Sequence, residues 1–339
     1  MKISSQVNTE GFSTEHWYQV GRPALMVGGL LFLVLATVPF WGSGLVVDKL
    51  TTLFVYILLA VMWNLLAGYA GLVSVGQQAF LGLGGYFALR LVDIGMSPYP
   101  AFIVGALICA LVALVISVFA LRLKEGEFAI AMWVTAEVIR ILVMFDPIVQ
   151  GETGTSLLAM NQYAPELRRN INFWFGLLVV AGMLGLVLWL VNSRIGAAAQ
   201  AIRDDEEAAK SIGIRVMRVK QIIFVVAAFG CALAGSLWLA SSVTFQPRTY
   251  FGVQWTVFML FMVLVGGLKT FEGPILGAIV FFLLQEFFGD YGAWYLAGLG
   301  VTAILFALYA PNGIWGEWQN RKGVRFLPTG VTLTLKNKE

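Results

Sequence analysis

The sequence has 339 residues, of which 59% are apolar and only 12% are charged, and its formal net charge is +3. Soluble domains carry about 25% charged residues, so a chain this apolar cannot cover a water-facing surface with polar groups. These numbers exclude an ordinary soluble protein. They predict an all-α, polytopic integral membrane protein that has the lipid bilayer as its main solvent and no nucleic acid as a partner.

Ten apolar segments approach the length of about 20 residues that a membrane-spanning helix needs. They cover residues 23–41, 50–67, 71–92, 99–121, 127–145, 171–192, 220–240, 254–268, 273–289 and 292–310. The segments at 254–268 and 273–289 are short and could be broken or re-entrant, which is tolerated only where protein or a cavity surrounds the backbone. The chain then divides into an N-terminal arm (1–22), a transmembrane domain (23–310) and a C-terminal tail (311–339), with both arms expected in the cytoplasm.

Lysine and arginine are unevenly distributed between the loops of these ten segments. Sixteen lie in the loops and arms on the side of the two termini, and one, Arg140, lies inside a segment. The opposite side holds five, namely Lys49, Arg90, Arg168, Arg169 and Arg248. Because cytoplasmic loops carry the excess of positive charge, both termini are expected in the cytoplasm. An odd number of spans would remove this agreement.

The third segment is rich in glycine and glutamine. As a helix it would place small and polar residues on one face: Gly71, Ser74, Gln78, Gly82 and Gly85. Such a face indicates close helix packing in a membrane, with hydrogen bonds across the contact. It equally indicates a polar path lined by Ser74, Gln77 and Gln78, since two adjacent glutamines facing lipid would be costly. The two interpretations are compatible.

The fifth segment contains Glu137 and Arg140, three residues apart and therefore neighbours on one helix face. Charges inside a membrane are expensive and tend to pair or to face a cavity. A structural ion pair is favoured over direct substrate contact, which stays open. Glu286, preceded by Gln285, is a similar case in the ninth segment.

The loop 193–220, called the coupling loop below, is the long charged run in the interior of the chain. Its centre predicts a short helix that Asp204 or Asp205 caps, with Glu206 and Glu207 in the first turn and Gly213 at the end. It is either a plain connection between two spans or a surface shown to a soluble partner. Sequence chemistry alone favours neither.

Motifs for catalysis are absent from the sequence. His16 is the single histidine, and Cys109 and Cys231 lie in apolar segments, so neither a metal cluster nor a catalytic triad is expected. No G-x-x-x-x-G-K-[ST], H-E-x-x-H or G-x-S-x-G is present. The chain is therefore not expected to be an enzyme, to bind a cofactor or to hydrolyse ATP itself.

Several blocks of sequence resemble a known family. The coupling loop contains E-A-A-x-x-x-G, made by Glu207, Ala208, Ala209 and Gly213, the motif by which permeases of bacterial ABC importers dock on their ATPase. Ile223 follows as in that motif, but two valines stand where the family often has Leu-Pro. The blocks GYAGLVSVGQQAFLGLGGYFA, LRLKEGEFAIAMWVTAEVIRIL, GETGTSL, VLVGGLKTFEGPILGAIVFFLLQE and PNGIWG follow the order of the family. From about residue 50 to 316 the chain resembles branched-chain amino acid permeases of the LivM type.

This resemblance implies a multi-pass subunit of the bacterial inner membrane that pairs with a second, LivH-like permease. Two ATP-binding subunits, which use ATP and Mg²⁺, would drive the pair, and an extracytoplasmic substrate-binding protein would supply leucine, isoleucine or valine. It implies that the ATPase contact is made by Arg203, Asp204, Glu206, Glu207, Ala208, Ala209 and Gly213. The proposed substrate pathway comprises Ser74, Gln77, Gln78, Phe80, Glu137 and Arg140.

Alternatives to this function stay open from the sequence. One is a permease of the same architecture for urea or short amides. Another, from a different class, is an ATP-independent channel or secondary transporter, for which Glu137, Arg140 and Glu286 are the candidate ion-coupling residues. A scaffold protein without transport activity is a third, weaker alternative.

Overall fold

The computed structural model describes residues 12–16, 22–322 and 331–335 of the chain. Parts of the two expected arms, residues 1–11, 17–21, 323–330 and 336–339, lie outside the described residues. The first helices are α1 (Arg22–Trp41), α2 (Gly44–Asn64), α3 (Gln78–Asp93), α4 (Pro98–Ala120), α5 (Glu125–Met144), α6 (Pro165–Val191), α7 (Arg194–Asp204) and α8 (Glu206–Ser211). The others are α9 (Val216–Ser242), α10 (Pro247–Tyr250), α11 (Gln254–Gly266), α12 (Gly273–Phe288), α13 (Ala293–Tyr309) and α14 (Gly313–Lys322).

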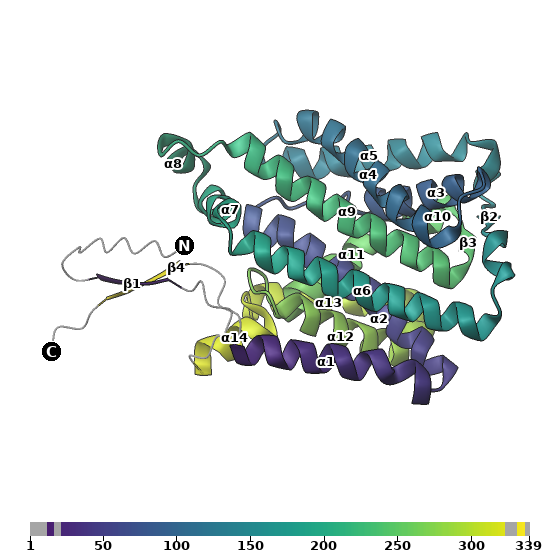
Figure 1. Ribbon diagram of the computed structural model, residues 1–339. Coiled ribbons are helices and arrows are strands. Elements are labelled where there is room, and N and C mark those ends of the chain that lie inside the picture. Colours follow the sequence, from purple (N-terminus) through teal and green to yellow (C-terminus); the bar gives the residue numbers. More distant parts are fainter. Residues whose placement is uncertain (1–11, 17–21, 323–330, 336–339) are drawn as a thin grey trace.

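Short elements complete the described chain. A π-helix, η1 (Leu65–Tyr69), continues α2, and 3-10 turns lie at η2 (Pro147–Val149), η3 (Leu158–Gln162) and η4 (Gly289–Tyr291). Two antiparallel strand pairs are formed by β1 (Phe12–His16) with β4 (Val331–Leu335), and by β2 (Thr155–Ser156) with β3 (Thr244–Phe245). The long helices lie side by side, with α7, α8 and the β1–β4 pair at one end and the β2–β3 pair at the other (Figure 1).

Seven apolar segments among the described residues are long enough to cross a membrane. They are Gly44–Tyr69, Pro98–Ala120, Pro165–Val191, Val216–Ser242, Pro247–Gly266, Gly273–Tyr291 and Ala293–Gln319. Two of them, Pro247–Gly266 and Gly273–Tyr291, cover most or all of the two predicted spans that looked too short in the sequence. The protein is therefore a mostly helical, multi-pass membrane protein. Helices α1, α3 and α5 occupy the remaining predicted ranges.

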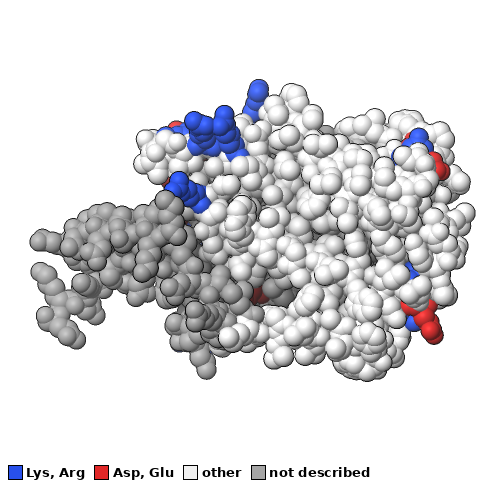
Figure 2. Space-filling view, in the orientation of Figure 1, with Lys and Arg blue, Asp and Glu red and all other residues white. Residues whose placement is uncertain are grey.

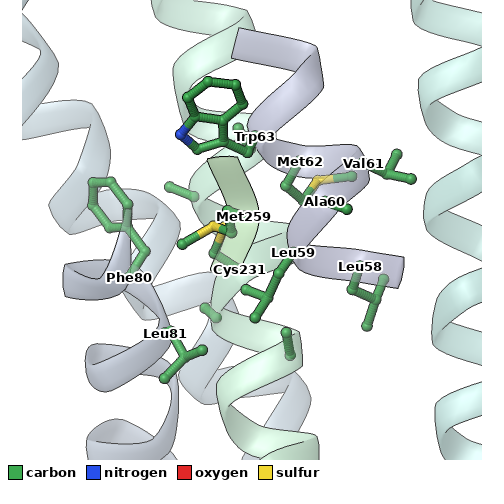
Figure 3. Close-up of a cluster of buried hydrophobic side chains, with 14 of the residues drawn as sticks. Leu58, Leu59, Ala60, Val61, Met62, Trp63, Phe80, Leu81, Cys231 and Met259 are labelled. Atoms are coloured by element: carbon green, nitrogen blue, oxygen red, sulfur yellow. The ribbon is translucent and has the colours of Figure 1, made fainter. Parts of the chain in front are cut away.

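The centre of the bundle is formed by α2 and α9. In the apolar window of α2 and η1, 83% of the residues are buried, against 6% in the window of α13 and α14. Figure 3 shows side chains of the core where α2, α3, α9 and α11 meet, among them Leu58, Leu59, Met62, Trp63, Phe80, Leu81, Cys231 and Met259. The outer helices keep large apolar side chains exposed, as expected for helices that face lipid or another subunit.

Small residues let the central helices approach closely. A methyl group added to Gly84 of α3 would lie 2.1 Å from the carbonyl oxygen of Ala232 in α9, and one on Gly235 would lie 1.9 Å from the carbonyl oxygen of Leu81. Backbones pack this closely only where side chains are absent, which is how helices associate in a membrane without a hydrophobic driving force between them.

The predicted third span differs from the structure in its first seven residues. Residues 71–77 are not helical, and α3 begins at Gln78. Gln78, Gly82 and Gly85 all belong to α3, at the spacing of one helix face, but the prediction that Gly71 and Ser74 continue this face is wrong. Gly71 has a φ of +70°, which ends the preceding helix. The indole of Trp63 donates to the carbonyl oxygen of Ser74 at 2.9 Å, so buried protein satisfies this irregular backbone.

Charge is concentrated at the two ends of the bundle. Figure 2 shows lysine and arginine gathered over α7, α8 and the start of α9, while the middle of this face is almost free of charged residues. A smaller mixed group of charges marks the opposite end. This is the distribution expected of a protein with a lipid-covered belt between two water-exposed ends.

Candidate functional site

The coupling loop folds as two helices joined at Asp205. The short helix predicted at its centre is α8, whereas α7, which precedes it, was not predicted. The Ser193 hydroxyl accepts from the backbone N–H of Ile195 at 3.1 Å and starts α7. Asp205 has extended backbone angles that end α7, and its side chain accepts from the N–H groups of Glu207 and Ala208 at 2.9 and 3.0 Å. Asp205 is therefore the N-cap of α8, which was one of the two predicted caps.

Gly213 ends the second helix. Its φ is +86°, a conformation that L residues rarely adopt, and nothing lies within 4 Å of a methyl group added to it. The position is restricted by backbone conformation and open in space. Glycine is therefore required here by the turn from α8 into α9, while the surface around it stays free.

Glu206 holds α8 against α9. Its carboxylate accepts from Lys220 Nζ at 2.5 Å, and Lys210 Nζ lies 3.2 Å from its other oxygen. The hydrogen bond from Lys220 is the largest influence on the Glu206 pKa and lowers it below its ordinary value, although partial burial acts in the opposite direction. Ala209, on the inner side of α8, is buried. Glu206 and Ala209 are thus fixed to the protein's own surface.

Four other predicted docking residues lie on the outward side of α8 or beside its two ends. Glu207 has a side chain that is 85% exposed, and Ala208, Asp204 and Gly213 are exposed as well. Ile212, which the sequence analysis did not single out, is 75% exposed directly before Gly213. A free apolar side chain beside carboxylates at the tip of a basic end is a surface suited to a soluble partner.

Arg203 connects the coupling loop to the centre of the bundle. Its Nη1 donates to the carbonyl oxygen of Gly68 in η1 at 2.8 Å, while Nε and Nη2 donate to Asp204 at 2.9 and 2.7 Å. Gly71 packs against Arg203, because a methyl group added to Gly71 would lie 3.3 Å from the Arg203 Cα. The end of α7 therefore touches the point where α2 turns into the irregular segment 70–77.

The opposite side of the same turn is held by the loop between α11 and α12. The Asn64 side chain donates to the carbonyl oxygen of Thr270 at 2.8 Å and accepts from the N–H of Lys269 at 3.2 Å. Added carbon on Gly68 would collide with the Asn64 amide oxygen at 2.3 Å. The irregular turn is thus clamped between α7 and the α11–α12 loop.

The four predicted path residues of this segment lie together inside the protein. Ser74, Gln77, Gln78 and Phe80 are each at most 1% exposed. The Gln78 amide oxygen accepts a hydrogen bond from the Thr256 hydroxyl of α11, and Gln77 accepts from Cys231 Sγ at 3.7 Å. The amide nitrogen of Gln77 has no partner among the described residues.

Glu137 and Arg140 lie elsewhere, on the outward side of α5. Arg140 Nη2 lies 2.5 Å from Glu137 Oε1, which is the ion pair that the sequence predicted. A second carboxylate, Glu152 of the following loop, lies 2.9 Å from Arg140 Nη1 and was not predicted. Glu286 pairs with Lys49 of α2 and does not join this group.

A cavity of about 370 Å³ opens at the end opposite to the coupling loop. It is lined by Asp48, Thr52, Pro165, Arg168, Arg169, Asn172, Trp238, Ser241 and Ser242. Arg169 Nε donates to Asp48 at 2.9 Å, and the Asn172 amide is satisfied by Tyr99 and Ala240. None of these residues was predicted as a site, because they come from three helices and share no motif in the sequence.

One family model matches most of the chain. The model of the family described as branched-chain amino acid transport system / permease component matches residues 45–309. The high-affinity branched-chain amino acid transport system permease protein LivM of Escherichia coli (strain K12) is 26% identical over 86% of this chain and 75% of that protein. LivM of Salmonella typhimurium is 25% identical over the same shares. A solved structure described as an inward-facing ABC transporter of the metal-chelate type aligns with a TM-score of 0.47 at 13% identity, over 85% of this chain and 99% of that one.

Proposed function

The chain belongs to the family of permease components of branched-chain amino acid transport systems, and we propose that it is the membrane subunit of an ATP-driven importer for leucine, isoleucine and valine. The names of its LivM relatives support this substrate class. In the proposed assembly, a LivH-like second permease, two ATP-binding subunits and an extracytoplasmic substrate-binding protein join this chain in the bacterial inner membrane. ATP and Mg²⁺ are used by the ATP-binding subunits, and this chain binds no cofactor.

One observation carries the coupling part of the proposal. The exposed side of α8, which carries Glu207 and Ile212, projects from the basic end of the bundle and is built on a capped, anchored helix. A surface that transmits force has to be fixed to the part that moves. Glu206 and Ala209 supply that attachment to α9, and Arg203 supplies the one to η1.

The proposed mechanism is alternating access. When the ATP-binding subunits close, they shift α7 and α8, and Arg203 passes the shift to the carbonyl of Gly68 and so to the segment 70–77. Gln77 and Gln78 then separate from Cys231 and Thr256, and polar groups that are buried in this state become available to a zwitterionic substrate. Phe80 supplies apolar contact. The docking surface has to bind the two ATPase states differently for this to work.

We infer that ten segments cross the membrane, with both termini in the cytoplasm. The pairing of β1 with β4 supports an even number of crossings, because hydrogen-bonded strands have to lie on the same side of a bilayer. The excess of lysine and arginine at the end with α7 and α8 supports a cytoplasmic position for that end. The α1, α3 and α5 helices supply the crossings beyond the seven apolar segments.

Uptake measurements test the proposal. In cells that express the whole assembly, Glu207→Lys or Gly213→Trp is expected to abolish uptake of labelled leucine while the chain stays inserted. Glu166→Lys, a charge reversal on an exposed residue of the opposite end, is the matched control and is expected to transport normally. Normal uptake by the α8 variants would disprove the docking assignment.

Competition separates the alternative functions. Unlabelled isoleucine and valine are expected to compete with leucine, whereas urea is not. Strong competition by urea would favour a permease for urea or short amides. Uptake driven by an ion gradient in the absence of any ATPase would favour a secondary transporter.

A further inference from the structure

Helix α5 presents a mixed face to the outside of this subunit. One side is buried against its neighbours through Phe128, Met132, Ala136 and Val143. The opposite side is exposed along its length through Ile130, Trp133, Val134, Val138, Ile141 and Leu142. Glu137 lies in the middle of these apolar residues, and half of its side chain is exposed.

This carboxylate lies within the depth of the membrane. Twenty helical residues span about 30 Å, close to the thickness of the hydrocarbon core. The neighbouring α4, an uncharged apolar segment, crosses in the opposite direction, and a short turn joins it to α5. Glu137 precedes the outer end of α5 by seven residues, which places it about 10 Å below that end.

The ion pairs around Glu137 leave it incompletely neutralised. Glu137 and Glu152 share one guanidinium, that of Arg140, so the group carries a net charge of −1. Both hydrogen bonds to Glu137 end on Oε1, and the bond to Glu152 also ends on Oε1. The Oε2 atoms of the two carboxylates accept nothing from the described residues.

A half-exposed, incompletely paired carboxylate at this depth cannot face lipid at low cost. A dry contact with an apolar surface of another subunit would leave the Oε2 atoms unsatisfied, which is also costly. Water or a cation satisfies them. The α4 helix shows the contrast, because its exposed residues, such as Leu107, Leu111 and Val115, are all apolar.

We propose that the outward face of α5 lines the water-filled translocation path and that Glu137, together with Glu152, receives the ammonium group of the amino acid on its way through. The inference rests on the proposed function for the identity of the substrate. The apolar residues beside Glu137, Val134 and Val138, contact the aliphatic side chain. Arg140 holds the two carboxylates in place and is a positioning residue.

Cysteine accessibility tests the path directly. Val134→Cys lies one turn before Glu137 on the exposed face, and Leu107→Cys on α4 is its control. Val134 and Leu107 are 54% and 51% exposed and lie at similar depth, about 14 Å from the outer ends of their helices. Cys109 and Cys231 are completely buried, so the wild-type chain gives the unreactive baseline. Each variant is treated, in membranes that contain the assembled transporter, with a cationic and an anionic methanethiosulfonate.

The cationic reagent is expected to modify Val134→Cys at least about tenfold faster than Leu107→Cys, because thiolates form in water and not in lipid. It is also expected to react several-fold faster than the anionic reagent, and Glu137→Gln is expected to remove this preference. Leucine in excess is expected to slow the reaction. Equal, slow modification of the two cysteines would overturn the inference.

Uptake in the same membranes separates this inference from the proposed function. If leucine uptake depends on ATP and Val134→Cys is not modified, the permease function stands and the path lies elsewhere. If Val134→Cys is modified with the expected preference and the wild-type transporter takes up no amino acid, the path stands and the substrate assignment fails.

Discussion

The contact between Arg203 and Gly68 gives the sharpest prediction. Replacing Arg203 by alanine removes the donor at 2.8 Å that joins α7 to η1 and leaves the fold of α8 in place, since Asp205 and Glu206 hold that helix independently. A hydrogen bond from a charged donor contributes about 1.5–3 kcal/mol. If that contact exists in only one of the two transport states, its loss changes the coupling between ATP hydrolysis and transport by about 10–150-fold.

The assay is the number of ATP molecules hydrolysed for each leucine transported, measured with the complete transporter in proteoliposomes. Arg203→Ala is expected to keep its ATPase activity and to lose transport, so that this ratio rises at least about tenfold. Arg203→Lys keeps the charge and loses the planar fork, so its ratio is expected to lie between those of the wild type and Arg203→Ala. Arg194→Ala removes an exposed arginine from the other end of α7 and is the control. An unchanged ratio in Arg203→Ala would refute the reasoning.

Three further predictions concern packing and charge. Gly84→Ala is expected to lower the free energy of unfolding by about 1–3 kcal/mol, because the new methyl group would collide with the Ala232 carbonyl. The loss is measured as a lower thermal midpoint in detergent. Gly182→Ala is the control and is expected to be neutral, because nothing lies within 4 Å of the added methyl group. Thr256→Val leaves the buried Gln78 oxygen without its donor and is expected to cost about 1–3 kcal/mol, which Thr256→Ser restores; an equal loss in both variants would contradict this account. Because the folded pKa of Glu206 is lowered, its stabilisation of α8 is present above the ordinary glutamate pKa of 4.5 and is lost as the pH falls through the lower folded value. After correction for the intrinsic rate, the amide hydrogen exchange of α8 is therefore expected to be constant from neutral pH down to about 5 and to become faster below that pH. Glu206→Gln is expected to remove this pH dependence.

Apolar length was sufficient to predict where the helices lie. Each of the ten predicted segments contains a helix, because about 20 apolar residues have few other ways to satisfy their backbone in lipid. The same reasoning failed at residues 71–77. Their composition resembles that of a tightly packed helix. Their irregular conformation is stabilised by contacts with Trp63, on the other side of the turn, and with Arg203, which is distant in sequence.

The coupling loop shows a similar limit. The sequence predicts a capped helix with acidic residues in its first turn, and Asp205, Glu206 and Glu207 occupy those positions. The sequence does not reveal that a second helix, α7, precedes this cap, because the alanine-rich stretch before Arg203 has no pattern that distinguishes it in an apolar chain. The outer cavity and the role of Glu152 could not be predicted, because they depend on which helices are neighbours.

The pairing of β1 with β4 has a consequence for how the protein is made. The two strands are separated by more than three hundred residues, so they cannot pair until nearly all of the chain has been synthesised. Contacts of such high sequence separation form late, because a long loop has to close before they are gained. The strand pair therefore forms late in synthesis, and it forms only if the intervening segments have crossed the membrane an even number of times. A split reporter with one half fused near each strand would give a signal only in molecules in which the two strands have come together.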